Sequence, residues 1–212
     1  MRLNVEFSAA VGRTDLDDYI RNLEITVTCY DEDGLNEYVV GKLALDQILW
    51  ADAQTDGVSL FEVCDNDSQG MHELHVILTQ GKQEFRSDLR INEVTSHVLF
   101  LYGAVFHPSI HPYRQGILDT AFRLFGDESL AVMWKETSGL SEAELAELGF
   151  CKVAGAELIF RHSTLRTPFG DQHPRGIDTD DTVAEPECEE WVLKEWRRFA
   201  GAVEPQEEGG AA

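Results

Sequence analysis

The sequence predicts an α/β (α+β) protein with a mixed, mostly antiparallel central sheet and helices on both faces. Residues 98–106 are apolar apart from the Tyr102 hydroxyl, which is typical of a strand buried on both faces. Residues 117–125 then repeat apolar side chains at helical spacing, and another apolar run at 129–134 follows Gly126. This order of strand, helix and strand indicates a parallel βαβ unit with a right-handed crossover.

The composition is that of a folded globular chain, since 43% of the 212 residues are hydrophobic and 9% are aromatic. Seventeen basic residues against 39 acidic residues give a net charge of −22, which would repel nucleic acid and anionic membranes. We therefore expect no nucleic-acid partner and no membrane partner. The negative charge could attract a cationic substrate, imitate the charge of DNA or keep the protein in solution, and we favour solubility.

Four cysteines are scattered along the chain without a CxxC pair. The first residues alternate like a strand instead of forming an apolar leader, and no apolar stretch is long enough to span a bilayer. These features predict reduced, mostly buried thiols in a cytoplasmic protein, without a disulfide or zinc framework.

The first half of the chain alternates apolar and polar residues in a way that predicts antiparallel strands. Alternation at residues 3–7 predicts one strand, and the runs at 23–30 and 38–45, joined by the turn at 31–34, predict a hairpin. Helical spacing follows at 46–53. Ser59 and Glu62 then form the capping box of a longer helix that Gly70 interrupts.

A pair of histidines on this helix is one pattern that could suggest a metal, as is the acidic turn at 31–33, which lacks the pattern of a calcium loop. His72 and His75 are three residues apart, whereas the zinc-protease motif needs four, and no third ligand is evident. We therefore interpret both as surface histidines and predict no metal.

The second half closes with three local signals. Ser141 and Glu144 form a second capping box, Gly149 suits a left-handed helix cap, and residues 150–162 form one long strand or a hairpin bent at Gly155.

Three pieces of this half resemble the GNAT (Gcn5-related N-acetyltransferase) family. They are the strand VLFLYGAVFHP, the turn and helix HPYRQGILDTAFRLFG, and the closing SEAELAELGF with its Leu-Gly-Phe ending. The resemblance covers residues 93–162, about a third of the chain. It implies a GNAT-like sheet with a βαβ core that binds acetyl-CoA. The first half matches only loosely, because its helices follow a hairpin, whereas the family places them after its first strand.

The resemblance implies where acetyl-CoA, the co-substrate, would bind. In the family the fourth strand splays from the fifth, and its free backbone groups pair with the pantetheine arm; the matching positions here are Ala104, Val105 and Phe106. A glycine turn at the next helix then holds the pyrophosphate through backbone amides. Neither ungapped register preserves the family's full turn pattern. The matching turn residues are Tyr113, Arg114, Gln115, Gly116 and Ile117.

Catalytic groups are harder to assign from the resemblance. The family often has a tyrosine acid four residues before the Leu-Gly-Phe glycine, where this chain has Leu145, so Tyr102 on the central strand is the nearest substitute. Glu93 and His97 flank the start of that strand and are the candidates for a general base.

The resemblance therefore implies an acetyl-CoA-dependent N-acetyltransferase that acts on a primary amine, of a small molecule or a protein, by direct transfer. The alternative is a catalytically inactive GNAT-fold binding or regulatory protein, favoured by the altered turn and by Leu145. A weaker alternative is a DNA mimic with its carboxylates along one elongated face.

The chain divides into one domain and a tail. We expect a single domain over residues 1–162, divergent at 1–92 and with its core motifs at 93–162, followed by a linker at 163–188. A helix at 189–202 precedes a disordered tail at 203–212. Trp191 and Trp196 on this helix form either a docking face, for a homodimer or a protein partner, or a strut packed on the domain itself. We favour the strut, since an exposed tryptophan pair promotes aggregation.

Overall fold

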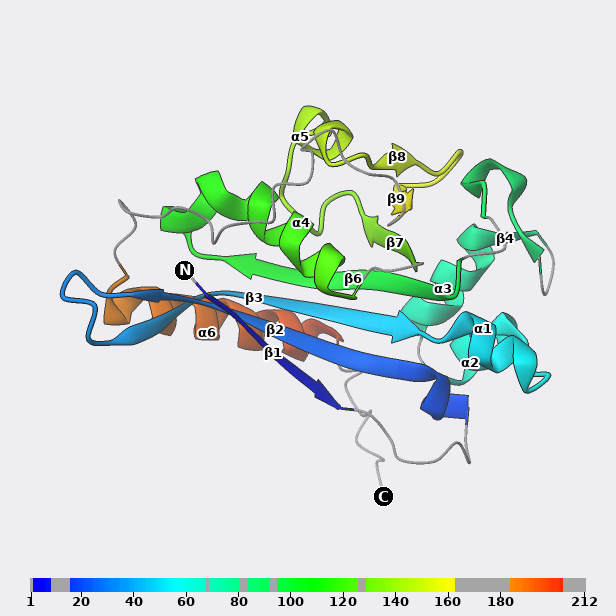
Figure 1. Ribbon diagram of the computed structural model, residues 1–212, viewed down its shortest axis with the longest axis horizontal. Helices are drawn as coiled ribbons and strands as arrows, with labels where there is room; N and C mark the ends of the chain where they lie inside the picture. Colours follow the sequence, from blue (N-terminus) through cyan, green and yellow to red (C-terminus); the bar gives the residue numbers. More distant parts are fainter. Residues whose placement is uncertain are drawn as a thin grey trace, which may run out of the picture.

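A seven-stranded sheet dominates the part of the chain that the computed structural model describes (Figure 1). The described residues are 2–8, 16–67, 69–80, 84–91, 95–125, 129–162 and 184–203. The strand order is β1-β2-β3-β6-β7-β9-β8, and all neighbours are antiparallel except the parallel pair β6–β7. This confirms the predicted class and the parallel unit at its centre. The strands are β1 (Arg2–Ser8), β2 (Ile20–Tyr30), β3 (Glu37–Ile48), β6 (His97–Phe106), β7 (Ser129–Trp134), β8 (Cys151–Lys152) and β9 (Leu158–His162).

Helices lie on both faces of this sheet. In Figure 1, α4 (Arg114–Phe125) and α5 (Glu142–Glu147) lie on one side of it, and α6 (Pro186–Val203) passes behind β2 and β3. The helices α1 (Trp50–Thr55), α2 (Leu60–Asp67) and α3 (Gln69–Leu78) gather at one end of the sheet. Smaller elements complete the described chain: η1 (Leu16–Tyr19), η2 (Ser87–Leu89), η3 (Pro108–Tyr113) and the two-stranded ribbon of β4 (Thr79–Gln80) and β5 (Glu84–Phe85).

The central strand β6 divides the core into two clusters because successive side chains point to opposite faces. Leu99 and Leu101 pack in a cluster with Ile117 and Phe122 of α4. Val98 and Phe100 pack in a second cluster with residues of α1, α2 and α3. The prediction of a strand buried on both faces is therefore confirmed for this part of β6.

The local signals of the sequence form as predicted. At both capping boxes the glutamate carboxylate accepts the backbone N–H of the serine, and the serine hydroxyl accepts the backbone N–H of the glutamate (Ser59 with Glu62, Ser141 with Glu144). Gly149 follows α5 with a φ of 81°, a conformation that glycine adopts without strain. The segment at 150–162 is the hairpin alternative, β8 and β9.

Two predictions about the first half are wrong. Residues 46–48 belong to β3 rather than to a helix, because they pair with 20–22 of β2 and Asn22 Nδ2 donates to Asp46 Oδ1 at 2.8 Å. The helix starts only at Trp50. His75 is not a surface histidine: its side chain is buried between α3 and its neighbours, with Nε2 3.3 Å from Thr79 Oγ1.

The C-terminal helix α6 packs onto the sheet, which confirms the strut. It begins at Pro186 rather than Glu189, since proline is well tolerated at the first helical position. Lys42 Nζ lies 5.1 Å from the centre of the Trp196 ring, and Phe199 covers Gly103 of β6. Residues 163–183 of the predicted linker and the tail at 204–212 lie outside the described residues.

None of the described helices combines the length and the apolar character needed to cross a membrane.

Candidate functional site

The candidate site begins where β6 extends beyond its parallel neighbour. Residues 97–101 of β6 pair with 129–133 of β7, whereas 103–106 pair only with 41–44 of β3. Among the described residues no strand pairs with the other edge of 102–106. The carboxyl ends of parallel strands, where neighbouring connections diverge, are a common place for ligands in α/β sheets. Ala104, Val105 and Phe106 therefore lie on a backbone edge of β6 that no described strand covers, which we call the open edge.

A β-bulge marks the point where β6 leaves β7. The register with β3 shifts there, with Leu101 opposite Leu45 but Gly103 opposite Ala44, so Tyr102 is the extra residue. Bulges are frequent beside active sites because they redirect a side chain. The half-buried ring of Tyr102 stacks on Phe199 of α6, with 6.3 Å between ring centres. Tyr102 thus lies at the start of the open edge, with its ring packed against the C-terminal helix.

The predicted glycine turn is not an open turn. Pro108–Tyr113 form the 3₁₀ helix η3, and α4 follows it directly, so Arg114, Gln115, Gly116 and Ile117 occupy the first turn of α4. The backbone N–H of Arg114 already donates to His111 O. Ile117 is 0% exposed and belongs to the core, whereas Gly116 is exposed. A ligand would therefore reach this turn at Gly116 and not at the Ile117 side chain.

The Arg114 guanidinium joins three segments of the site. Its Nε donates to His111 O at 3.2 Å, and its Nη1 donates to Gly139 O at 3.0 Å in the loop after β7. Gln115 Nε2 donates to Glu147 Oε2 at 3.1 Å, which adds a bond from α4 to α5. Since arginine has five N–H donors, the two hydrogen bonds of Arg114 leave further N–H groups that can donate to a phosphate. Tyr113, the remaining residue of the predicted turn, packs partly buried against the core.

Sequence reasoning missed two histidines at the end of β6. His107 Nδ1 accepts the backbone N–H of Ser109 at 3.3 Å, and the His107 ring lies 5.4 Å from the Trp191 ring. Burial lowers the pKa of His107, and the positive charge of His111 lowers it further. His111 Nε2 lies 3.3 Å from Phe106 O. The available signal was the His-Pro pair that ends the strand, which by itself indicates only a strand end.

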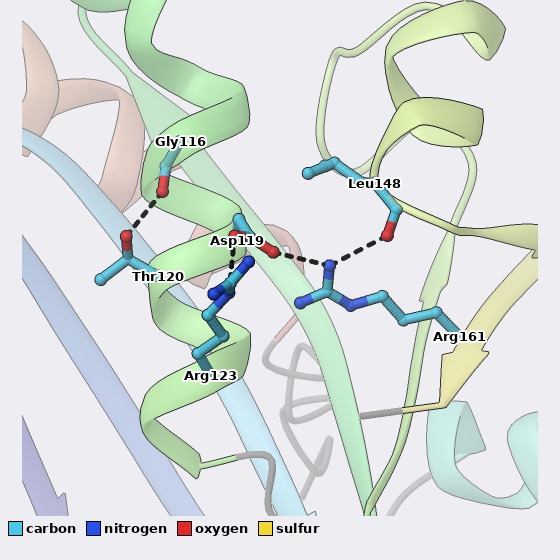
Figure 2. Close-up of polar contacts among 6 residues, drawn as sticks. All are labelled: Gly116, Asp119, Thr120, Arg123, Leu148 and Arg161. Atoms are coloured by element: carbon cyan, nitrogen blue, oxygen red, sulfur yellow. Dashed lines mark hydrogen bonds and ion pairs between the residues drawn. The ribbon is translucent and has the colours of Figure 1, made fainter. Parts of the chain in front are cut away.

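A buried ion pair fixes α4 to strand β9 (Figure 2). Arg161 Nη1 of β9 donates to Asp119 Oδ1 of α4 at 2.9 Å and to Leu148 O, at the end of α5, at 3.0 Å. Arg123 Nε also approaches Asp119, at 2.7 Å to Oδ2. This pair holds α4, and with it the first turn at Arg114, in a fixed position relative to β7 and β9. The i,i+4 spacing of Asp119 and Arg123 is visible in the sequence, whereas no local pattern pairs Asp119 with Arg161.

Of the other candidate catalytic residues, His97 lies away from the open edge. Leu145 is 4% exposed and part of the core, as an apolar side chain requires. His97 starts β6, nine residues before Phe106, which corresponds to about 30 Å along a strand. Glu93 lies outside the described residues. The structure therefore brings Tyr102 and residues 104–106 together and separates them from His97.

The described residues contain no group of three or more histidine, cysteine, aspartate or glutamate side chains that could hold a metal ion. No disulfide links the four described cysteines, of which Cys29, Cys64 and Cys188 are buried and Cys151 is exposed.

No protein-family model, curated protein or solved structure matches this chain.

Proposed function

We propose that the protein is an acetyl-CoA-dependent N-acetyltransferase that binds the pantetheine arm along the open edge of β6. The observation that carries this proposal is the loss of β7 pairing beyond Leu101. A pantetheine arm contains two amides, and an exposed strand edge offers backbone donors and acceptors at the spacing that an extended amide chain uses. In sheet order β6 is the fourth strand and β7 the fifth, which are the strands that splay in the GNAT family.

Direct transfer places few demands on the protein. The amine nitrogen attacks the thioester carbonyl, the carbon–sulfur bond breaks, and the proton lost by the amine reaches the sulfur of the leaving CoA. Holding the amine against the thioester supplies much of the acceleration. Tyr102, at the bulge that starts the open edge, is the candidate donor of the proton to sulfur.

The second candidate is a GNAT-fold binding or regulatory protein without transferase activity. Two observations favour it: the amide of Arg114 is already bonded within η3, and Leu145 is a core residue. Both candidates fit a reducing cytoplasmic location, since no disulfide links the described cysteines.

Calorimetric titration with acetyl-CoA tests the proposal, and Gly116→Leu is the informative variant. Gly116 is exposed on the first turn of α4, where a leucine side chain would obstruct a diphosphate. Gly201→Leu, at an exposed glycine of α6 with no neighbour within 4 Å, is the matched control. We expect wild type and the control to bind acetyl-CoA and Gly116→Leu to lose binding.

The outcomes separate the two candidates. Binding followed by acetylation of an amine supports the transferase, and binding without turnover supports the binding protein. If wild-type protein released no heat with acetyl-CoA, the protein would be neither an acetyl-CoA-dependent transferase nor an acetyl-CoA-binding protein.

A further inference from the structure

The ring of Tyr102 is held between two other aromatic rings. Phe100, on the same strand, lies 6.1 Å away between ring centres, with 41° between the ring planes. Phe199 of α6 lies 6.3 Å away with only 28° between the planes, so these two rings stack. We propose that Phe199 is a positioning residue for acetyl transfer, which orients Tyr102 so that its hydroxyl donates a proton to the leaving sulfur. This inference rests on the proposed function, in which Tyr102 is the proton donor.

The position of Tyr102 in β6 makes the packing of its ring decisive. The register with β3 steps past Tyr102 at the β-bulge, and the ladder with β7 ends one residue earlier, at Leu101. A bulge redirects the side chain of its extra residue away from the regular alternation of a strand. The direction in which the Tyr102 ring points therefore depends on the side chains that it packs against.

The residue after Tyr102 makes room for the Phe199 ring. A Cβ at Gly103 would lie 2.4 Å from both Cε1 and Cζ of Phe199, closer than real contacts allow. A glycine inside a strand often marks such a close approach. The Phe199 ring thus lies directly against the backbone of β6, beside Tyr102 and at the start of the open edge.

Contacts that do not involve Phe199 also hold α6 on the sheet. Glu189 Oε2 accepts the backbone N–H of Val39 at 3.2 Å, and Val192 is 0% exposed. We therefore expect α6 to remain in place when Phe199 is replaced by leucine. This separates the packing of the helix from the orientation of Tyr102.

The kinetics of acetyl transfer test the proposal, followed through the loss of thioester absorbance with acetyl-CoA and a panel of primary amines (short alkylamines and a lysine peptide). Phe199→Leu keeps an apolar side chain but removes the ring. We expect it to lower kcat about tenfold, which is part of what a general acid contributes, and to leave the calorimetric Kd for acetyl-CoA unchanged. Phe199→Tyr keeps the ring and should retain kcat.

Val192→Ala is the matched control for the stability of α6. It removes buried methyl groups from the same helix, so it should lower the free energy of unfolding. We expect its kcat to equal that of the wild type at temperatures well below its unfolding.

A double-mutant cycle distinguishes positioning from structural support. In a Tyr102→Phe background, Phe199→Leu should lower kcat no further, because no hydroxyl is left to orient. An equal fall in both backgrounds, or an equal fall in Val192→Ala, overturns the proposal, as does transfer that Tyr102→Phe leaves unchanged. These outcomes leave the transferase itself standing. Acetyl-CoA binding without transfer to any amine overturns the transferase and the role of Phe199 together.

Discussion

Arg161 and Asp119 are 42 residues apart in the chain, yet Arg161 Nη1 lies 2.9 Å from Asp119 Oδ1 (Figure 2). The Arg161 side chain is 7% exposed, and its guanidinium carbon lies 5.2 Å from the Phe122 ring centre and 5.3 Å from that of Phe150. Burial lowers the pKa of Arg161, and the carboxylate of Asp119 opposes that shift. The buried guanidinium thus lies against two aromatic rings, with Asp119 as the carboxylate that balances its charge.

Replacing Asp119 by alanine should destabilise the protein by about 2–3 kcal/mol, because it leaves a buried guanidinium without its carboxylate. Urea unfolding followed by circular dichroism measures this change. Arg123→Ala removes the more exposed partner of the same carboxylate and should cost only about 0.5 kcal/mol. Equal losses in the two variants would mean that the buried pair contributes no more than the surface pair.

A methyl group at Gly103 should loosen α6. A Cβ built there would lie 2.4 Å from Cε1 and Cζ of Phe199, closer than real contacts allow. We expect Gly103→Ala to destabilise the protein by about 1–3 kcal/mol and to change the fluorescence of Trp196, whose ring lies 5.3 Å from that of Phe199.

A second substitution shows whether the clash with Phe199 is the cause. In a Phe199→Ala background, Gly103→Ala should cost much less than in the wild type, which is the coupling expected of residues in contact. Gly201→Ala in α6, with no atom within 4 Å of its Cβ, should be neutral or slightly stabilising. Additive effects of the changes at 103 and 199 would argue against the contact.

The environment of His107 predicts a pH dependence of stability. Burial, and then the charge of His111, lowers its pKa from the ordinary 6.5. Between the folded pKa and 6.5 the unfolded chain binds more protons, so the free energy of unfolding falls as the pH drops through this window. Urea unfolding at several pH values should show this slope, and His107→Gln should remove it.

The carboxylates with lowered pKa values titrate at lower pH, so they do not obscure the pH dependence of stability that His107 causes. Hydrogen bonds and basic partners lower the pKa values of Asp31, Asp88, Glu142, Glu144 and Glu157 from ordinary values of 3.8 or 4.5. An NMR titration of the His107 ring measures its pKa directly. In that titration His111→Gln should raise the pKa of His107 only part of the way to 6.5, since burial is the larger cause. A His107 pKa at or above 6.5 would contradict the prediction.

The sequence predicts those features of the fold that depend on residues close together in the chain. The serine and glutamate of each capping box are three residues apart, and Gly149 follows directly on the helix that it caps. Both signals depend on backbone groups within one turn, so they form wherever the residues occur in that order.

Tertiary pairing accounts for what the sequence did not predict. Residues 46–48 have helical spacing, yet pairing with β2 gives their backbone groups better partners. The turn predicted at residues 113–117 is instead the end of η3 and the first turn of α4, and η3 accommodates Pro108 at its start and Pro112 within it. The contact of Phe199 with Gly103 joins two segments that no local pattern relates.

Gly139 provides the final prediction, which concerns the support of the candidate site. It has a φ of 63°, and a Cβ there would lie 2.9 Å from Arg114 Nη1, the atom that donates to its own carbonyl. Gly139→Ala should therefore destabilise the protein by about 2 kcal/mol, part of it from backbone strain and part from displacing Arg114.

Comparison with Gly155→Ala isolates the part of the destabilisation by Gly139→Ala that is due to displacing Arg114. Gly155 has a φ of 79° with nothing within 4 Å of a Cβ, so its replacement costs backbone strain alone, about 1 kcal/mol. We expect thermal unfolding to show a larger loss at 139 than at 155, and that excess should disappear in an Arg114→Ala background. If the excess persisted there, the Arg114–Gly139 bond would not be what fixes the loop after β7 to the first turn of α4.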